Sequence, residues 1–181
     1  MSNIMTVEDR MRSRLTSFLS VALLATAAFL VPASPAAAAP SFRTPFPCHQ
    51  TWSGETRTTH SPQYAIDFNR ADDHGDPVKA SAPGTVDVVA NLGDTSYGRY
   101  VRINHGGGYT TYYAHLSGFN VSVGQSVGYA TTIGYVGNSG GSSGSHLHYE
   151  QRLNGSDIMV RFSGNLALYF GTQNYTRTAG C

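Results

Sequence analysis

The chain has 181 residues, 40% of them hydrophobic, and 12 basic residues nearly balance 11 acidic ones, giving a formal net charge of +1 at pH 7. This length is enough for a domain with a substantial core. The near-neutral charge, with Lys79 as the single lysine, argues against nucleic acid or an anionic membrane as the main partner.

Residues 1–39 have the organisation of a secretory signal peptide. Three arginines within residues 10–14 precede an apolar run over residues 15–31, and the small-residue stretch PASPAAAAP follows. The run is short for a membrane span, and serine and threonine interrupt it. We therefore expect cleavage near Ala39, export without a membrane anchor, and a location outside the cell or in the cell wall.

The remaining chain, residues 40–181, contains two cysteines, Cys48 and Cys181, one near each end. In an exported protein this arrangement favours one disulfide over two free thiols. We expect a single domain over residues 40–181, with its core at about residues 48–160 and its termini tied by this disulfide.

Short segments rich in Val, Tyr, Thr and Ile follow one another, separated by Gly-rich turns, and windows with apolar residues at helical spacing are scarce. The pattern predicts an all-β fold, a Gly-rich antiparallel β-sandwich or a barrel-like pair of sheets. Residues 138–145, NSGGSSGS, are expected to form a long flexible loop on one rim, where ligand contacts often lie. The segments expected to be strands are residues 63–69, 84–92, 97–104, 108–116, 131–137 and 145–153.

The last of these segments contains two histidines, His146 and His148, in the stretch GSHLHYE. Strand side chains alternate between faces, so both imidazoles should point the same way. A zinc hydrolase site needs three protein ligands and leaves the fourth position for water, and histidine and aspartate are suitable ligands. The chain has no HExxH motif, so a helical zinc site of that type is excluded. Taken alone, HxH fits a pair of exposed or tyrosine-packed histidines equally well.

Three motifs narrow this interpretation: HSPQYAIDFN (60–69), YAHL (113–116) and SGSHLHYE (143–150). Their content and order resemble those of the lysostaphin-like, or LytM-like, zinc endopeptidases, and the likeness extends over about residues 48–160. The resemblance implies a barrel-sandwich hybrid with a duplicated hybrid motif as the fold. It also implies one Zn²⁺ per chain as the cofactor.

The resemblance further implies the roles of five residues. His60, Asp67 and His148 would bind the zinc, while His115 and His146 would act on the attacking water and the transition state. Which of His115 and His146 is the general base stays open at this point.

One feature departs from the compact members of this family, which place the first ligand four residues before the aspartate. Gln63 occupies that position here, and His60 lies seven residues before Asp67. The longer spacing resembles the beta-lytic branch of the family. His49 and His74 remain as alternative ligands.

Glu150 falls on the same strand face as His146 and His148. It would either orient an imidazole from behind or lie exposed at the rim of the site, and the sequence favours the rim.

Together these observations predict a secreted, monomeric zinc metalloendopeptidase that hydrolyses peptide bonds in bacterial cell-wall peptidoglycan through zinc-activated water. Stem peptides and cross-bridges, including glycine-containing ones, are the substrates that the resemblance implies. The alternative is a non-catalytic peptidoglycan-binding or hydrolase-activating module on the same fold, although such modules lose ligands and all five positions remain here. A biotinyl- or lipoyl-like carrier is disfavoured because Lys79 lies outside the Gly-rich hairpin that would carry the cofactor.

Overall fold

The computed structural model describes residues 38–181. The signal peptide expected over residues 1–39 therefore lies outside the described residues, except for its last two. Residues 38–181 contain no helix, and hence none long and apolar enough to cross a membrane.

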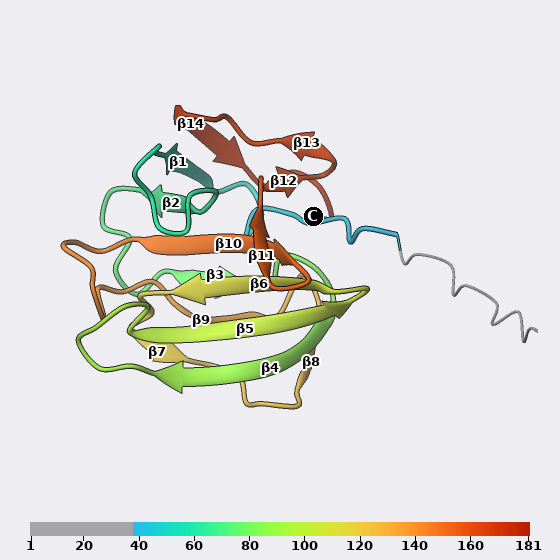
Figure 1. Cartoon of the computed structure of the whole chain (residues 1–181), viewed down its shortest axis with the longest axis horizontal. Helices are drawn as coiled ribbons and strands as arrows, with labels where there is room; N and C mark the ends of the chain where they lie inside the picture. The colour runs from blue at the N-terminus through green and yellow to red at the C-terminus, as the bar shows by residue number, and fades with distance from the viewer. Residues whose placement is uncertain (1–37) are drawn as a thin grey trace, which may run out of the picture. The chain divides into compact units, whose positions relative to one another are not determined.

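The described residues form fourteen strands, and every strand pairing is antiparallel (Figure 1). The prediction of an all-β antiparallel fold is confirmed. The strands are β1 (Thr51–Thr56), β2 (Ile66–Asn69), β3 (Pro77–Lys79), β4 (Gly84–Asn91), β5 (Arg99–Gly106), β6 (Tyr109–Ala114), β7 (Gly118–Phe119), β8 (Ser126–Val127), β9 (Thr132–Tyr135), β10 (Leu147–Leu153), β11 (Ser156–Ile158), β12 (Arg161–Phe162), β13 (Asn165–Leu166) and β14 (Gly171–Thr176).

The strands are divided among three sheets. The largest has the order β14-β1-β2-β10-β6-β5-β4-β8, and β11 pairs with β10. A second sheet has the order β3-β9-β7 and lies behind β6 and β5 in Figure 1, while β12 and β13 form a separate hairpin. Because β2 and β10 are neighbours in the middle of the large sheet, the two motifs that carry Asp67 and HxH meet there.

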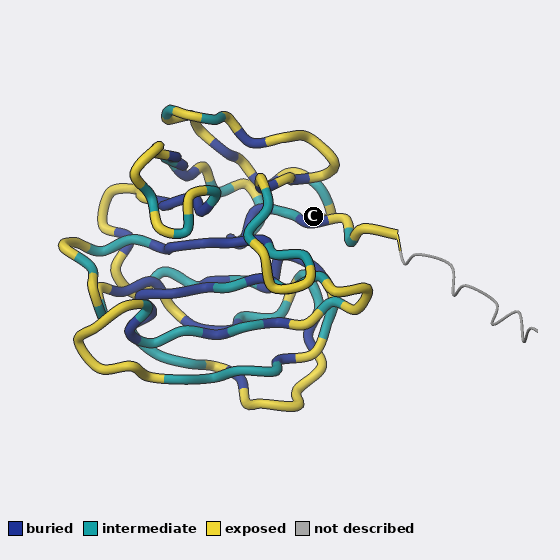
Figure 2. The backbone as a smooth tube through the Cα atoms, viewed as in Figure 1, coloured by how far each residue is buried: buried dark blue, intermediate teal, exposed yellow. Residues whose placement is uncertain are grey.

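The core lies between the large sheet and the three-stranded sheet. Val101 and Ile103 of β5 belong to the same fully buried cluster as Val78 of β3 and Ile133 of β9. Figure 2 shows the buried stretches of β10 and β6 running through the middle of the molecule. The central strands are therefore held from behind by close apolar packing, which keeps side chains on their other face in fixed positions.

Each of the six segments expected to be strands overlaps one, whereas the other eight strands were not expected. The longest of these eight are β1 and β14. In β1 the buried positions are Trp52, Gly54 and Thr56, which do not give an apolar alternation. Position 54 requires glycine, because a Cβ atom on this residue would lie only 2.6 Å from the Tyr175 ring of β14. The close approach of these paired strands thus removes the hydrophobic signal that identifies the other strands.

The ends of the described chain are joined by the expected disulfide between Cys48 and Cys181, whose Cα atoms lie 5.6 Å apart. The bond lies just beyond the β1–β14 ladder, in which Thr51 pairs with Thr176. The C-terminal strand, β14, therefore pairs with β1 and forms one edge of the large sheet.

Candidate metal centre and active site

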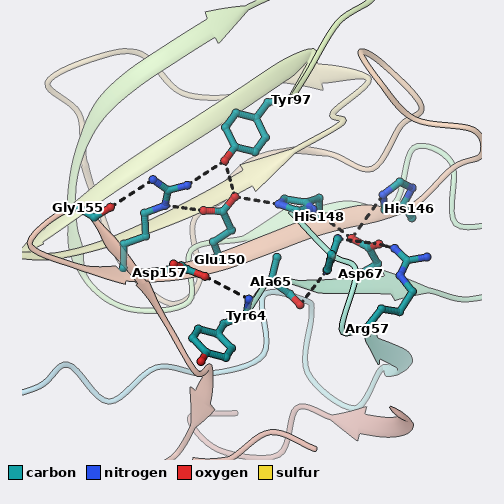
Figure 3. A network of polar contacts seen from close by, with 12 residues as sticks. Arg57, Tyr64, Ala65, Asp67, Tyr97, His146, His148, Glu150, Gly155 and Asp157 are labelled. Carbon is teal, nitrogen blue, oxygen red and sulfur yellow. Dashed lines mark hydrogen bonds and ion pairs between the residues drawn. The ribbon is translucent and has the colours of Figure 1, made fainter. Parts of the chain in front are cut away.

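Asp67 and His148 lie side by side on one face of the large sheet. Asp67 is in β2, His148 is in β10, and the register of the two antiparallel strands pairs them directly. Both are almost completely buried, and the Asp67 Oδ1 atom lies 3.1 Å from Nδ1 of His148. Strand pairing alone thus joins two residues that are far apart in the sequence (Figure 3).

His60 completes a group of three potential metal ligands. It comes from the loop between β1 and β2, where backbone hydrogen bonds from His60 to Arg57 and from Ala65 to Pro62 bring the chain back toward β2. The His60 Nδ1 atom donates to the carbonyl oxygen of Ala65 at 3.1 Å, and its other ring nitrogen, Nε2, lies 3.2 Å from Asp67 Oδ2.

One ligand atom each from His60, Asp67 and His148 lie within 4.8 Å of one another, a spacing that suits a single metal ion. His49 and His74, the alternative first ligands, do not belong to this group. The long His60–Asp67 spacing is therefore bridged by a loop.

A buried carboxylate determines which nitrogen of His148 faces Asp67. The Nε2–H of His148 donates to Glu150 Oε1 at 2.9 Å, which leaves Nδ1, the atom next to Asp67, as the ring nitrogen available to a metal ion. Glu150 is 1% exposed. The expectation that it lies exposed at the rim is wrong, because the β10 strand face on which it lies is covered by other side chains.

Two of those side chains are Tyr97 and Arg152. The Tyr97 hydroxyl donates to Glu150 Oε1 at 2.6 Å, Arg152 Nε donates to Glu150 Oε2 at 2.6 Å, and Arg152 Nη2 donates to the Tyr97 oxygen at 3.0 Å. Neither residue was predicted from the sequence to belong to the site. Arg152 follows Glu150 by two positions on the same strand, so the period of two gave a usable signal for it. Tyr97 comes from the loop before β5, where no pattern points to it.

His115 and His146 lie next to each other beside this group, with ring centroids 4.7 Å apart. His115 Nδ1 donates to the carbonyl oxygen of Ser139 at 2.8 Å, and His146 Nδ1 donates to that of Gly144 at 2.9 Å. A carbonyl oxygen only accepts, so each neutral ring keeps a lone pair on Nε2. The His146 Nε2 atom lies 3.7 Å from Asp67 Oδ1. Both acceptor residues, Ser139 and Gly144, belong to the Gly/Ser-rich loop over residues 138–145, which was expected on one rim of the fold.

Burial and hydrogen bonding shift the pKa values of these groups. Burial alone would raise the pKa of Asp67, but hydrogen bonds from His148 and His60 outweigh it and hold that pKa far below its usual range. Burial prevails at His115 and lowers its pKa to about 4, so this imidazole is neutral at pH 7. At His148 hydrogen bonds to Asp67 and Glu150 outweigh the effect of burial and raise the pKa to about 9. A metal ion therefore competes with a proton at His148.

The five predicted site residues line one hollow of about 480 Å³, together with side chains from the surrounding loops. The structure thus brings together His60, Asp67, His115, His146 and His148, all five residues that the resemblance implied. It adds Arg57, Tyr97 and Arg152 to the walls of the same hollow. Buried ligand atoms, two further imidazoles and an open approach form an arrangement able to carry out metal-assisted hydrolysis.

Several known proteins are similar to this chain. Among curated proteins, the DD-carboxypeptidase/endopeptidase Mpg of Neisseria meningitidis is 45% identical over 84 residues, which are 46% of this chain and 19% of Mpg. The peptidoglycan DD-endopeptidase ShyA of Vibrio cholerae is 42% identical over 84 residues, again 46% of this chain and 19% of that protein. The chain therefore spans about a fifth of the length of these relatives. Among solved structures, a zinc-containing peptidase from Vibrio cholerae matches with a TM-score of 0.55 and 26% identity, over 71% of this chain and 40% of that one.

A sequence profile of Peptidase family M23 matches residues 61–160, more than half of the 181 residues. The matched segment contains Asp67, His115, His146 and His148, and His60 immediately precedes it. The chain therefore belongs to Peptidase family M23.

Proposed function

We propose that this protein is a secreted zinc metalloendopeptidase that hydrolyses peptide bonds in the stem or cross-bridge peptides of bacterial peptidoglycan. Mpg and ShyA, whose names describe endopeptidases, support the reaction, and the name of ShyA supports peptidoglycan as the substrate. The disulfide Cys48–Cys181 and the signal-peptide pattern of residues 1–39 support export, because structural disulfides persist in oxidising compartments. We further propose that the enzyme acts as a monomer.

The observation that carries this proposal is the convergence of His60, Asp67 and His148 beside two more imidazoles. Two histidine nitrogens and one carboxylate oxygen form a donor set that suits zinc, and hydrogen bonds from the other ring nitrogens of both histidines fix their orientation. When bound, zinc supplies Lewis acidity toward the peptide carbonyl and an activated nucleophilic water.

His115 and His146 supply the proton transfers in this proposal. Each neutral ring keeps a lone pair on Nε2, and the His146 Nε2 atom lies 3.7 Å from Asp67 Oδ1. The low pKa of His115 keeps that ring neutral at pH 7. A neutral imidazole accepts a proton from the attacking water at Nε2 and returns it to the leaving amine. The neighbouring imidazole, when it carries a proton on Nε2, donates a hydrogen bond to the developing oxyanion.

The test measures zinc content and the clearing of cell-wall turbidity in the wild-type protein, His115→Ala and His148→Ala. We expect about one zinc ion per wild-type chain and a loss of zinc in His148→Ala. His115→Ala should retain the metal and lose activity by about 100-fold or more. His105→Gln is the matched histidine control, because His105 donates to the Pro83 carbonyl oxygen and does not line the hollow.

Full activity in both site variants would overturn the proposed site. Zinc binding without hydrolysis of any peptidoglycan would favour the alternative function, a non-catalytic peptidoglycan-binding or hydrolase-activating module on the same fold.

A further inference from the structure

Two hollows meet at the ligand group, and together they form a groove. The hollow of about 480 Å³ contains His115 and His148, and a second hollow of about 220 Å³ extends toward Glu55 and Asn69. A peptide that crosses the ligand group from one hollow to the other must pass the residues that line both. These shared residues are Arg57, Asp67, Ser143 and His146.

Arg57 is the cation at this junction. It directly follows the last residue of β1, and its Nη2 atom donates a short hydrogen bond to Asp67 Oδ2, as Figure 3 shows. Its side chain is 46% exposed, whereas that of Asp67 is 8% exposed. The guanidinium thus lies against the ligand group with one edge while its other N–H groups remain accessible from the groove.

Within residues 38–181, only a weak contact with another carboxylate competes with a ligand for those other N–H groups. The nearest other carboxylate is Glu55 Oε2, 3.7 Å from Arg57 Nη1, and that side chain is 41% exposed. A contact of this length between two exposed side chains contributes little, so an incoming carboxylate is able to replace it.

In Arg152, the other arginine of the groove, each of the three guanidinium nitrogens already has a partner within the protein. Its guanidinium donates to Glu150, to the Tyr97 oxygen and to the Gly155 carbonyl oxygen, and its side chain is 21% exposed. Arg57 is therefore the arginine of the groove with donors to spare, and guanidinium groups match carboxylates in a two-point geometry.

We propose that Arg57 is a specificity-determining residue that binds a carboxylate of the substrate next to the scissile bond. The preferred substrate class is then a peptide with a free acidic group within about two residues of that bond, because extended chain advances about 3.3 Å per residue. An uncharged glycine bridge would lack this contact. The inference rests on the proposed function of the same groove.

The test uses two synthetic cross-linked stem peptides that are identical except at the group flanking the scissile bond. One carries a free carboxylate there, and the other carries a primary carboxamide of the same shape. The wild-type protein should cleave the acid with kcat/KM about fivefold to tenfold higher than the amide, with the difference in KM. Arg57→Gln should cleave both at the rate of the amide. Arg161→Gln, which removes an exposed arginine outside the groove, should keep the wild-type preference.

A binding measurement provides a second readout that does not depend on turnover. Calorimetric titration of both peptides into zinc-loaded His115→Ala should show tighter binding of the acid, and adding Arg57→Gln should remove the difference. Zinc content is measured in parallel, because Arg57 also contacts Asp67 and its loss could act through the metal.

The possible outcomes separate the two proposals. Equal cleavage of acid and amide by the wild-type protein, or an equal decrease for both peptides in Arg57→Gln, would overturn the role of Arg57 and leave the endopeptidase proposal standing. Cleavage of neither peptide nor of whole peptidoglycan would overturn the proposed function. In that case equal binding of the two peptides would overturn the role of Arg57 as well, and tighter binding of the acid would support it.

Discussion

The Nε2 atom of His148 lies 2.9 Å from Oε1 of Glu150, and this contact turns Nδ1 of the same ring toward Asp67. The carboxylate accepts from three side chains at once: His148, Tyr97 and Arg152. It is therefore the group that orients the strand-borne ligand, although it does not belong to the ligand group itself.

Replacing Glu150 by Gln should weaken zinc binding by roughly 10- to 100-fold. The amide is nearly the same size, but its NH₂ group must face either the His148 N–H or the Arg152 N–H, so one donor always meets another donor. Competition with a chromophoric zinc chelator measures the affinity. Tyr97→Phe removes one donor and leaves the carboxylate in place, so it should have a smaller effect. Equal zinc affinity in the wild-type protein and Glu150→Gln would show that Glu150 does not position His148.

Tyr149 lies between His148 and Glu150 in the sequence, but its side chain points into the core. It is completely buried, donates to Ser81 Oγ at 2.9 Å and accepts from Gln151 Nε2 at 3.1 Å. Tyr149→Phe leaves both partners without this hydroxyl, and should lower the free energy of unfolding by about 1–3 kcal/mol. Urea unfolding measures the loss, while the activity per folded molecule should stay at the wild-type level. A change in activity without a change in stability would contradict the separation of the two faces of β10.

His105 gives the protein a pH-dependent stability that does not involve the active site. Burial lowers its pKa below 6.5, partly offset by the hydrogen bond to the Pro83 carbonyl oxygen. A folded-state pKa below the unfolded value means that the unfolded chain binds the extra proton first. The contribution of His105 is therefore present above about pH 6.5 and is lost as the pH falls through the folded-state pKa.

His105→Gln removes this titration. We expect the difference in unfolding free energy between the wild-type protein and His105→Gln to become less favourable to the wild type on going from pH 8 to pH 5. Comparing the two proteins at each pH cancels the other titrating groups. A difference that stays constant, or that grows toward acid pH, would rule out the lowered pKa.

The strands that could be predicted from the sequence are those with one face packed on the core. In β5 and β10 the buried residues Val101, Ile103, Leu147 and Tyr149 alternate with polar ones, and the period of two is visible. β14 lacks it because it is an edge strand with a single buried residue, Tyr175. β14 forms a strand because it pairs with β1, and this contact between distant segments leaves no local pattern in the sequence.

The same distinction, between local sequence patterns and contacts of distant segments, applies to the residues of the candidate site. The HxH spacing predicts a shared face for His146 and His148, and the family resemblance supplied the other members of the group. The role of Glu150 could not be deduced, because its burial depends on Tyr97, a loop residue that reaches it across 53 positions of sequence. Arg57 was missed for a similar reason, since only the loop between β1 and β2 brings it to Asp67.

The Cys48–Cys181 disulfide offers the largest stability effect that the structure predicts. The two residues are 133 positions apart, so the bond closes most of the described chain into one loop and restricts the unfolded state strongly. The chain-entropy relation gives about 5 kcal/mol for a loop of this length, as an upper value. The β1–β14 ladder, with Thr51 opposite Thr176, still holds the two ends together in the folded state when the bond is absent.

The double variant Cys48→Ser, Cys181→Ser should therefore fold to the same structure and lose up to about 5 kcal/mol of unfolding free energy. Urea unfolding of the double variant and of the oxidised wild-type protein measures the loss, and reduction of the wild type should reproduce it. Neither cysteine lines the hollow at the ligand group, so zinc content should be unchanged at a temperature where the variant is folded. Equal urea midpoints in the two proteins would contradict this prediction. They would show that the disulfide does not measurably destabilise the unfolded chain.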